Sequence, residues 1–392
     1  MDELDQHMKE LERKDFNQED FEFYEQIVHG KMFVNVEPVE KVDQHMDTLE
    51  GDDCNWGTPN WETINDKKFD SEMSFKSEIF PIQDLPEEVI LKVFSNLVPK
   101  DLLRTSQVSK RFQRISRDKS LWERVNLSNK IVKSKFIKLI LNMGCKSLNL
   151  KDSSILGRLK RHKVSRLRKL ELSNCTADDQ FLKTLLDSCC DLQYLALKGA
   201  AISNLVTSIC NNGQTLEKLN LSGTDTFGSD QPDQSYLQII KRCQKLREVN
   251  FSQISLSADA SFEIESLAKN ITPNIERLEL DCLDVTDYHI KILLRRCKKI
   301  KEMNLNATWI TDASLKNIKE NLDDALEELS LCDMNYISLS ELPQLKSMKR
   351  LKLLKLSTSL TEENEGDEEN EENDEIKNLR QQLPSLRIEV ED

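Results

Sequence analysis

Several basic side chains of this chain could bind a ligand through their charge. They recur at equivalent positions of a short segment that is repeated along the sequence. Side chains alternate between the two faces of a strand, so such positions share one face when neighbouring strands lie side by side. Ammonium groups and a phenol on one face suit a carboxylate or a phosphate. We therefore predict a site for an acidic or phosphorylated peptide, with Arg277 as a second anion-binding position, at Lys169, Tyr194, Lys198, Lys218 and Arg277. An ordinary solvated face is the alternative, and Glu279 and Asp281 could neutralise Arg277.

Residues typical of enzymes and metal sites form no recognisable pattern. Only ten glycines occur, and none builds a phosphate-binding loop. The ten cysteines include no Cys-x-x-Cys pair, which argues against a zinc site. The histidines lack a serine, cysteine or aspartate partner at a diagnostic spacing; they are His7, His29, His45, His162 and His289. The sequence therefore predicts no catalytic residue, no metal and no cofactor.

The basic positions belong to a template, L-x-x-L-x-L, that recurs along most of the chain. First residues of successive copies are 22 to 30 residues apart, which is the period of leucine-rich repeats. The copies begin at Cys145, Leu167, Leu192, Leu216, Leu246, Ile275, Ile300, Leu326 and Leu351, and a degenerate copy begins at Leu383. Each copy predicts a strand followed by a helix, and stacked copies share one core. The predicted class is α/β, as a horseshoe-shaped solenoid.

Cysteines also occur at a fixed place in the repeat. Cys189, Cys243 and Cys297 each lie three residues before the next copy, at the end of a predicted helix. Such a constant register favours buried packing over catalysis. Thr286 and Thr311 precede predicted helices and are suitable N-caps.

Residues 82–122 carry apolar side chains at helical spacing, with signals for three short helices. Asp84 and Glu87 have the spacing of a capping box, with Pro86 in the first turn, and Val98-Pro99 would end the first helix. Three short helices cannot bury this much apolar surface, so we predict a docking surface for a partner. It comprises Leu85, Pro86, Ile90, Phe94, Leu97, Leu102, Val108 and Phe112.

The same segment resembles the F-box family. The matching residues are Leu85-Pro86-x-Glu88, Val93-Phe94, Leu97, Asp101-Leu102, Val108, Arg111-Phe112 and Leu121-Trp122. Phe112 stands where members of the family often carry tryptophan. The repeats resemble the cysteine-containing leucine-rich repeats that commonly follow an F-box, and the layout is closest to the S-phase kinase-associated branch of the F-box/leucine-rich-repeat proteins.

The resemblance implies a non-catalytic substrate receptor of an SCF-type (Skp–cullin–F-box) ubiquitin ligase. The F-box would dock on a Skp-type adaptor and, through it, on a cullin. The repeats would bind a protein substrate for ubiquitination and proteasomal degradation, and cell-cycle regulators are the implied substrates. The need for substrate phosphorylation, or for a small accessory protein, stays open. A repeat scaffold that binds partners without ubiquitination is the alternative function.

Charge divides the chain into a basic body and acidic flanks. Residues 1–78 carry 22 acidic and 8 basic side chains and little periodicity, which predicts a mostly disordered region. Glu362–Glu375 contains ten acidic residues and no basic one, and the remainder has a net charge of +10. The predicted segments are the acidic N-terminal region 1–78, the F-box 79–125, the leucine-rich repeats 126–358, an acidic disordered loop 359–376, and a terminal repeat or cap 377–392.

Composition also restricts the partners and the compartment. The sequence has no run of 18 or more apolar residues and no secretory signal, so we expect no membrane span, reduced thiols, and a location in the nucleus and cytoplasm. The basic run 158–163 could serve nuclear import or lie in a solvated loop. We do not expect a nucleic-acid partner, because few aromatic side chains are interleaved with the basic ones.

Overall fold

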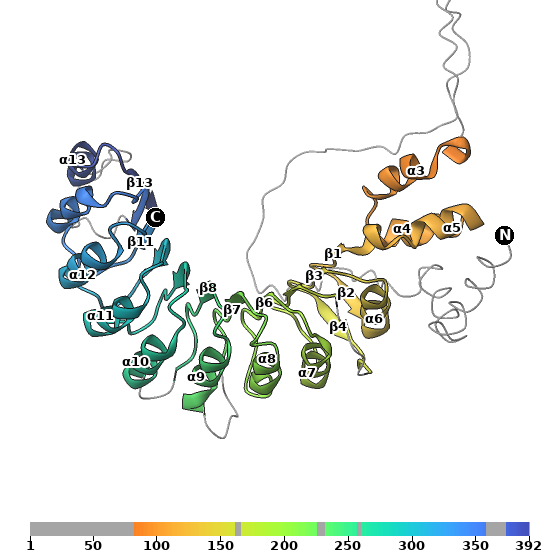
Figure 1. The fold of residues 1–392 in the computed structure, drawn as a ribbon, viewed down its shortest axis with the longest axis horizontal. Helices are drawn as coiled ribbons and strands as arrows, with labels where there is room; N and C mark the ends of the chain where they lie inside the picture. The colour runs from red at the N-terminus through yellow and green to blue at the C-terminus, as the bar shows by residue number, and fades with distance from the viewer. Residues whose placement is uncertain (1–81, 161–165, 226–231, 257–259, 358–373, 392) are drawn as a thin grey trace, which may run out of the picture.

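The computed structural model describes residues 82–160, 166–225, 232–256, 260–357 and 374–391. These residues form a curved array of strand–helix units with a small helical unit at its N-terminal end (Figure 1). Strands line the inner side of the arc and helices its outer side. The predicted α/β class, with short helices followed by a leucine-rich-repeat solenoid, is confirmed. The predictions for 1–78, and most of those for the acidic tract, fall outside the described residues.

The N-terminal unit is built from short helices: η1 (Ile82–Asp84), α3 (Glu87–Phe94), α4 (Pro99–Thr105), α5 (Lys110–Ser116) and η2 (Lys119–Trp122). Pro86 is the N-cap of α3 and no side chain caps this end, so the predicted capping box is wrong; Asp84 belongs to the preceding 3-10 turn. Pro99 is the first residue of α4, where its missing N–H costs nothing. The Ser109 hydroxyl caps α5 by accepting the N–H of Phe112 at 3.1 Å.

Within the described residues, eleven strands form one parallel sheet and follow one another in chain order. Strands β2 and β4 do not belong to it and pair with each other. The strands of the large sheet are β1 (Arg124–Asn126), β3 (Ser147–Asn149), β5 (Lys169–Glu171), β6 (Tyr194–Ala196), β7 (Lys218–Asn220), β8 (Glu248–Asn250), β9 (Arg277–Glu279), β10 (Glu302–Asn304), β11 (Glu328–Leu331), β12 (Leu353–Ser357) and β13 (Arg387–Glu391). The small pair consists of β2 (Ile131–Lys133) and β4 (Ser154–Leu156). All strands of the large sheet after β1 lie on predicted template copies.

Strand β1 belongs to a copy that the template search missed. Trp122, Val125 and Leu127 fill the three template positions, and all three are buried. Leucine is replaced by tryptophan at the first position, which hid the copy. Because Trp122 also closes the helical unit as the last residue of η2, that unit and the first repeat share one apolar core.

The outer face is covered by one helix per repeat in most of the array: α6 (Ser134–Asn142), α7 (Asp179–Ser188), α8 (Val206–Asn211), α9 (Pro232–Arg242), α10 (Ala260–Asn270), α11 (Asp287–Arg296), α12 (Asp312–Leu322), η3 (Leu339–Ser347) and α13 (Asp374–Gln382). Pro343 lies inside η3, where an α-helix would be disfavoured. At the C-terminal end β13 pairs with β12 from Leu353↔Arg387 onward. Helix α13 begins at Asp374, so the loop predicted at 359–376 is too long at this end.

His289 is a buried histidine that joins two repeats. Its Nδ1 accepts the N–H of Thr286 at 3.1 Å, which forms part of the capping box of α11, and its Nε2 lies 3.1 Å from the carbonyl oxygen of Ser261 in α10. A neutral ring with its proton on Nε2 satisfies both contacts. Burial lowers the pKa of His289, although the Ser261 carbonyl and the Glu265 carboxylate oppose this shift.

We expect the stability of the protein to fall as the pH drops below about 6.5, the ordinary pKa of histidine. The unfolded chain takes up a proton there before the folded chain does, so protonation favours unfolding. His289→Gln keeps an acceptor for the Thr286 N–H and removes this titration. Urea unfolding at pH 7.5 and pH 5.5 should show a smaller pH effect for the variant. An equal pH effect in both proteins would contradict the assignment to His289.

Candidate docking surfaces

The helical unit carries several exposed aliphatic side chains. Val89 and Val93 lie four residues apart on α3, and each is 43% exposed. Val98, between α3 and α4, and Val108, before α5, are more exposed still. Val89 and Val93 therefore share one exposed face of α3, and neighbouring exposed apolar side chains are a feature of protein docking sites.

The residues predicted to form this docking surface divide into two groups. Pro86 and Val108 are exposed, and Leu85 and Leu97 are partly buried. The predicted exposure is wrong for the other four, which form the interior of the unit: Ile90, Phe94, Leu102 and Phe112. These four side chains pack in the core beneath the exposed residues and are not themselves on the surface.

The adjoining repeat explains why three short helices can bury so much apolar surface. The rings of Phe94 and Phe112 pack edge to face, with centroids 5.3 Å apart. Trp122 is almost completely buried, and its indole Nε1 donates to the carbonyl oxygen of Ser116 at 2.7 Å. The core of the unit therefore continues into the first repeat, and the unit has no need of a partner to cover these side chains.

Sequence reasoning missed Val89, Val93 and Val98 as surface residues. The signal was present, because α3 has two apolar stripes, one with Ile90 and Phe94 and one with Val89 and Val93. Both stripes have the same i, i+4 spacing, so periodicity alone does not say which one faces the core.

Side chains of helix α5 hold the N-terminal end of α3 in place. The Arg111 guanidinium donates from Nη2 to the carbonyl oxygen of Leu85 at 2.6 Å, and Arg114 forms an ion pair with Glu87. The ion pair is exposed and contributes little stability, whereas the bond to the carbonyl fixes the chain that leads into α3.

The second candidate surface is the inner face of the large sheet. The first residues of neighbouring strands are paired in register, so Lys169, Tyr194 and Lys218 form one row across β5, β6 and β7. The central residue of each of these strands is buried on the opposite side. The sequence therefore placed these three side chains on the correct face.

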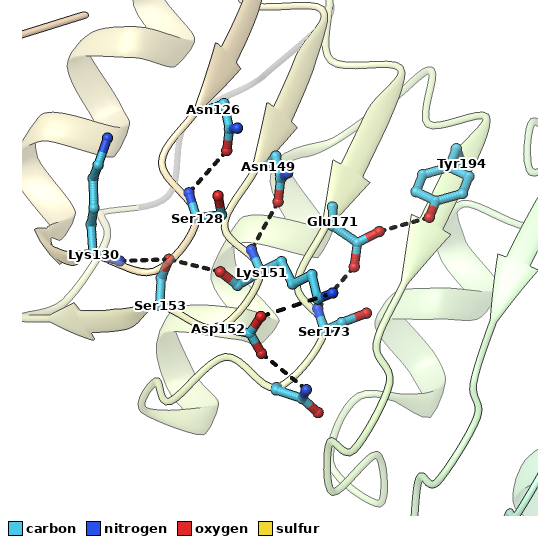
Figure 2. Close-up of polar contacts among 11 residues, drawn as sticks. Asn126, Ser128, Lys130, Asn149, Lys151, Asp152, Ser153, Glu171, Ser173 and Tyr194 are labelled. Carbon is cyan, nitrogen blue, oxygen red and sulfur yellow. Dashed lines mark hydrogen bonds and ion pairs between the residues drawn. The ribbon is translucent and has the colours of Figure 1, made fainter. Parts of the chain in front are cut away.

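Polar contacts hold many side chains of the inner face in one orientation (Figure 2). Asn149 accepts the N–H of Lys151 at 2.9 Å, and Glu171 accepts the N–H of Ser173 at 3.1 Å in the same way. The Tyr194 hydroxyl donates to the second oxygen of Glu171 at 2.7 Å. Burial, together with this bond and the Glu171 charge, raises the pKa of Tyr194. The phenol is therefore neutral and already engaged.

Some of the predicted basic residues of the binding site form ion pairs within the protein, and others do not. Lys218 lies 2.5 Å from Glu248 of the next strand, and Arg277 is likewise paired with Glu302. Lys169 and Lys198 are exposed, and neither forms an ion pair with another described residue. Lys198 lies in the turn just after β6, beyond the strand proper. These two lysines are the predicted positions with charge available for a ligand.

The far end of the inner face combines both signs of charge. A hollow of about 260 Å³ spans β9 to β12 and is lined in part by Arg277, Glu279, Glu302, Glu328 and Lys355. Burial raises the pKa of Glu279, whereas the neighbouring Arg277 acts in the opposite direction. This end can accept an extended polar segment.

The three cysteines at the fixed place in the repeat are structural. Cys189, Cys243 and Cys297 are buried, and burial raises their pKa values to about 12, about 12 and about 11. A thiol with so high a pKa is a poor nucleophile. No three histidine, cysteine, aspartate or glutamate side chains gather around a metal position in the part of the chain that the structure describes. No described helix is long and apolar enough to cross a membrane.

The chain resembles several known proteins. An F-box-like family model matches residues 82–128. The F-box protein DAS1 of Saccharomyces cerevisiae is 31% identical over 168 residues, which are 40% of this chain and 23% of that protein. The putative RNA-binding protein EEED8.10 of Caenorhabditis elegans is 26% identical over 274 residues, which are 68% of this chain and 34% of that protein. The chain thus spans about a quarter to a third of the length of these relatives.

Among solved structures, internalin C2 of Listeria monocytogenes matches 69% of this chain and 96% of its own, with a TM-score of 0.37 and 15% identity. The family model of the SKP2 LRR domain matches residues 135–388, which are more than half of the chain. With the F-box-like segment directly before these repeats, the chain belongs to the F-box/leucine-rich-repeat proteins with a repeat domain of the SKP2 type.

Proposed function

We propose that this protein is the substrate-recognition subunit of an SCF-type ubiquitin ligase. F-box domains generally bind Skp-type adaptors. The observation that carries the proposal is the number of exposed aliphatic side chains on the F-box. Of the ten large hydrophobic side chains that are exposed in the described residues, five lie on the F-box, although its core is already filled: Ile82, Val89, Val93, Val98 and Val108.

The arrangement separates the two tasks of such a receptor. The F-box lies at one end of the arc, and the inner face of the sheet runs away from it through all the repeats (Figure 1). An adaptor and its cullin bound at the F-box would leave the inner face open to a protein substrate. The chain then acts by raising the effective concentration of the substrate near a ubiquitin-charged enzyme. Cell-cycle regulators are the proposed substrates, and the nucleus and cytoplasm the proposed location.

Reconstitution tests this function directly. The full chain is co-expressed with a Skp-type adaptor and a cullin, and the mixture is separated by size-exclusion chromatography. We expect the three proteins to elute together, and proteins captured from cells by this assembly to carry ubiquitin chains. Failure of the adaptor to co-elute would overturn the proposal. Co-elution without ubiquitination of any bound protein would favour an interaction scaffold instead.

We expect Lys169→Glu with Lys198→Glu to weaken substrate capture at least tenfold without affecting the adaptor. A hydrogen bond to a charged group is worth about 1.5–3 kcal/mol, and both lysines offer their charge to a ligand on the inner face. Lys183→Glu, on the outer helix α7, makes the same charge change and serves as the control. The measurement is a paired pull-down of adaptor and ubiquitinated substrate. Unchanged capture by the double variant would place the substrate elsewhere on the repeats.

A further inference from the structure

Exposed aromatic side chains gather on one edge of the repeats, away from the F-box. Among the described residues, the large aromatic side chains that are exposed are Phe262, Tyr288, Trp309 and Tyr336. All lie close to the N-terminal ends of the consecutive outer helices α10, α11, α12 and η3, where the chain passes from a strand into a helix. Helices α10, α11 and α12 lie side by side in the array (Figure 1). We call the surface formed by Tyr288, Trp309 and Tyr336 the aromatic edge.

Two of these rings form an ordered platform. Trp309 and Tyr336 stack with centroids 5.7 Å apart and an angle of 24° between the ring planes. The indole Nε1 of Trp309 donates to the Asp284 carboxylate at 3.0 Å, which fixes the rotation of the ring. The Trp309 and Tyr336 side chains nevertheless remain 54% and 49% exposed.

The fold does not require aromatic residues at these positions. Trp309 precedes Thr311, the N-cap of α12, by two residues, and Tyr336 precedes Ser338, the N-cap of η3, by the same distance. Trp309 lies four residues after Leu305, the last template position of its copy, and the residue four positions after Leu197 in an earlier copy is Ala201. A stacked tryptophan and tyrosine therefore add apolar surface that the packing of a repeat does not need, which is a feature of interaction sites.

The turns that carry the aromatic edge are acidic. The turns at 281–288, 306–313 and 332–341 contain six acidic residues and no basic one. Lys269, on the neighbouring helix α10, is paired with Glu265, which also accepts the Tyr288 hydroxyl at 2.7 Å. A carboxylate can accept several hydrogen bonds, so Asp284 retains acceptor sites beside the indole.

We propose that the aromatic edge binds an arginine-bearing segment of a protein partner. A guanidinium is planar, stacks on aromatic rings and bonds carboxylates with its N–H groups, so it fits a ring platform beside Asp284 better than any other side chain. The site is distinct from the F-box and from the inner face, and it does not depend on the ligase function. A partner could therefore occupy it while adaptor and substrate are bound.

Peptide binding to the full chain tests the proposal. The probe is a fluorescein-labelled peptide of alternating glycine and arginine, compared at physiological ionic strength with its lysine and citrulline counterparts. We expect the arginine peptide to bind more tightly than the lysine peptide, and the uncharged citrulline peptide to bind least. Trp309→Ala with Tyr336→Ala should weaken the arginine peptide about fivefold or more, since each cation–π contact is worth about 0.5–1 kcal/mol at an exposed site.

Matched variants separate this site from general attraction of a cationic peptide to an acidic chain. Asp284→Asn should weaken binding of the arginine peptide, whereas Asp191→Asn, an exposed aspartate after α7, should not. Leu156→Ala removes the exposed hydrophobic residue of β4, on another part of the array, and should leave affinity unchanged. Equal affinity of the wild type and the Trp309/Tyr336 variant would overturn the proposal.

An NMR signal from Trp309 itself shows whether the peptide binds at the aromatic edge or elsewhere on the protein. In protein labelled with 5-fluorotryptophan, the ¹⁹F resonance of Trp309 is identified by its loss in Trp309→Phe, and we expect the arginine peptide to shift it. An unmoved Trp309 resonance in the presence of bound peptide would overturn the proposal. So would an equal shift by the citrulline peptide, which would show that the positive charge is not recognised, or a shift on raising the protein concentration alone, which would indicate a second copy of this chain.

Discussion

Replacing Val89 and Val93 by glutamate is expected to abolish adaptor binding while the repeats stay folded. Both side chains are exposed on α3, so the folded chain tolerates charge there. In a complex, however, two carboxylates would be buried without partners at the centre of an apolar contact. Apolar residues at such centres cost 2 kcal/mol or more when removed, so we expect affinity to fall at least about thirtyfold.

Titration calorimetry with a recombinant Skp-type adaptor measures this loss. Leu156→Glu makes the same kind of change at an exposed aliphatic residue of β4 and should bind as the wild type does. Circular dichroism should show the same thermal midpoint for both variants. If the Val89/Val93 variant bound the adaptor with full affinity, this face of α3 would not be part of the adaptor interface. A variant of buried Phe94 would be less informative, because lost binding could reflect an unfolded F-box.

We expect Trp122→Ala to lower the free energy of unfolding by about 3–5 kcal/mol. The side chain is 1% exposed and lies where the core of the F-box meets the first repeat. Its removal leaves a cavity and also deprives the Ser116 carbonyl oxygen of its 2.7 Å hydrogen bond. Adaptor binding should fall as well, because the cores of the F-box and the first repeat are continuous.

Urea unfolding of three variants tests this role. Trp122→Phe keeps most of the apolar volume but loses the hydrogen bond, so we expect an intermediate loss. Trp309→Ala deletes the same side chain at a half-exposed site and should lower the free energy of unfolding by about 1 kcal/mol, because it loses mainly the stacking on Tyr336. Equal losses for Trp122→Ala and Trp309→Ala would contradict the structural role of Trp122.

The repeats could be predicted from residue order because their signal is local and recurs. Leucines at a constant spacing have no stable place except a shared core, so the strands of the large sheet from β3 to β13 lie on the template copies. The same spacing showed that the cysteines were packing residues. The repeat that contains β1 was not recognised in the sequence, because Trp122 replaces the first leucine of the template, although Val125 and Leu127 keep the pattern.

Burial in the F-box could not be predicted, because it depends on how the short helices pack on one another. Two apolar stripes on α3 have the same period, and packing on α5, where the ring of Phe94 meets that of Phe112, places one of them in the core. The predicted docking set therefore included Ile90 and Phe94, which are in the core, and omitted Val89 and Val93, which are on the surface.

Charge and exposure on the repeats depend in the same way on neighbours about 25 residues distant in the chain. Lys218 and Arg277 have the residue types for anion binding, but strand register places Glu248 and Glu302 beside them. The aromatic edge likewise exists because consecutive repeats bring Asp284, Trp309 and Tyr336 together. A periodic pattern specifies which side chains are buried within a repeat, whereas the pairing of surface side chains arises only when the repeats stack.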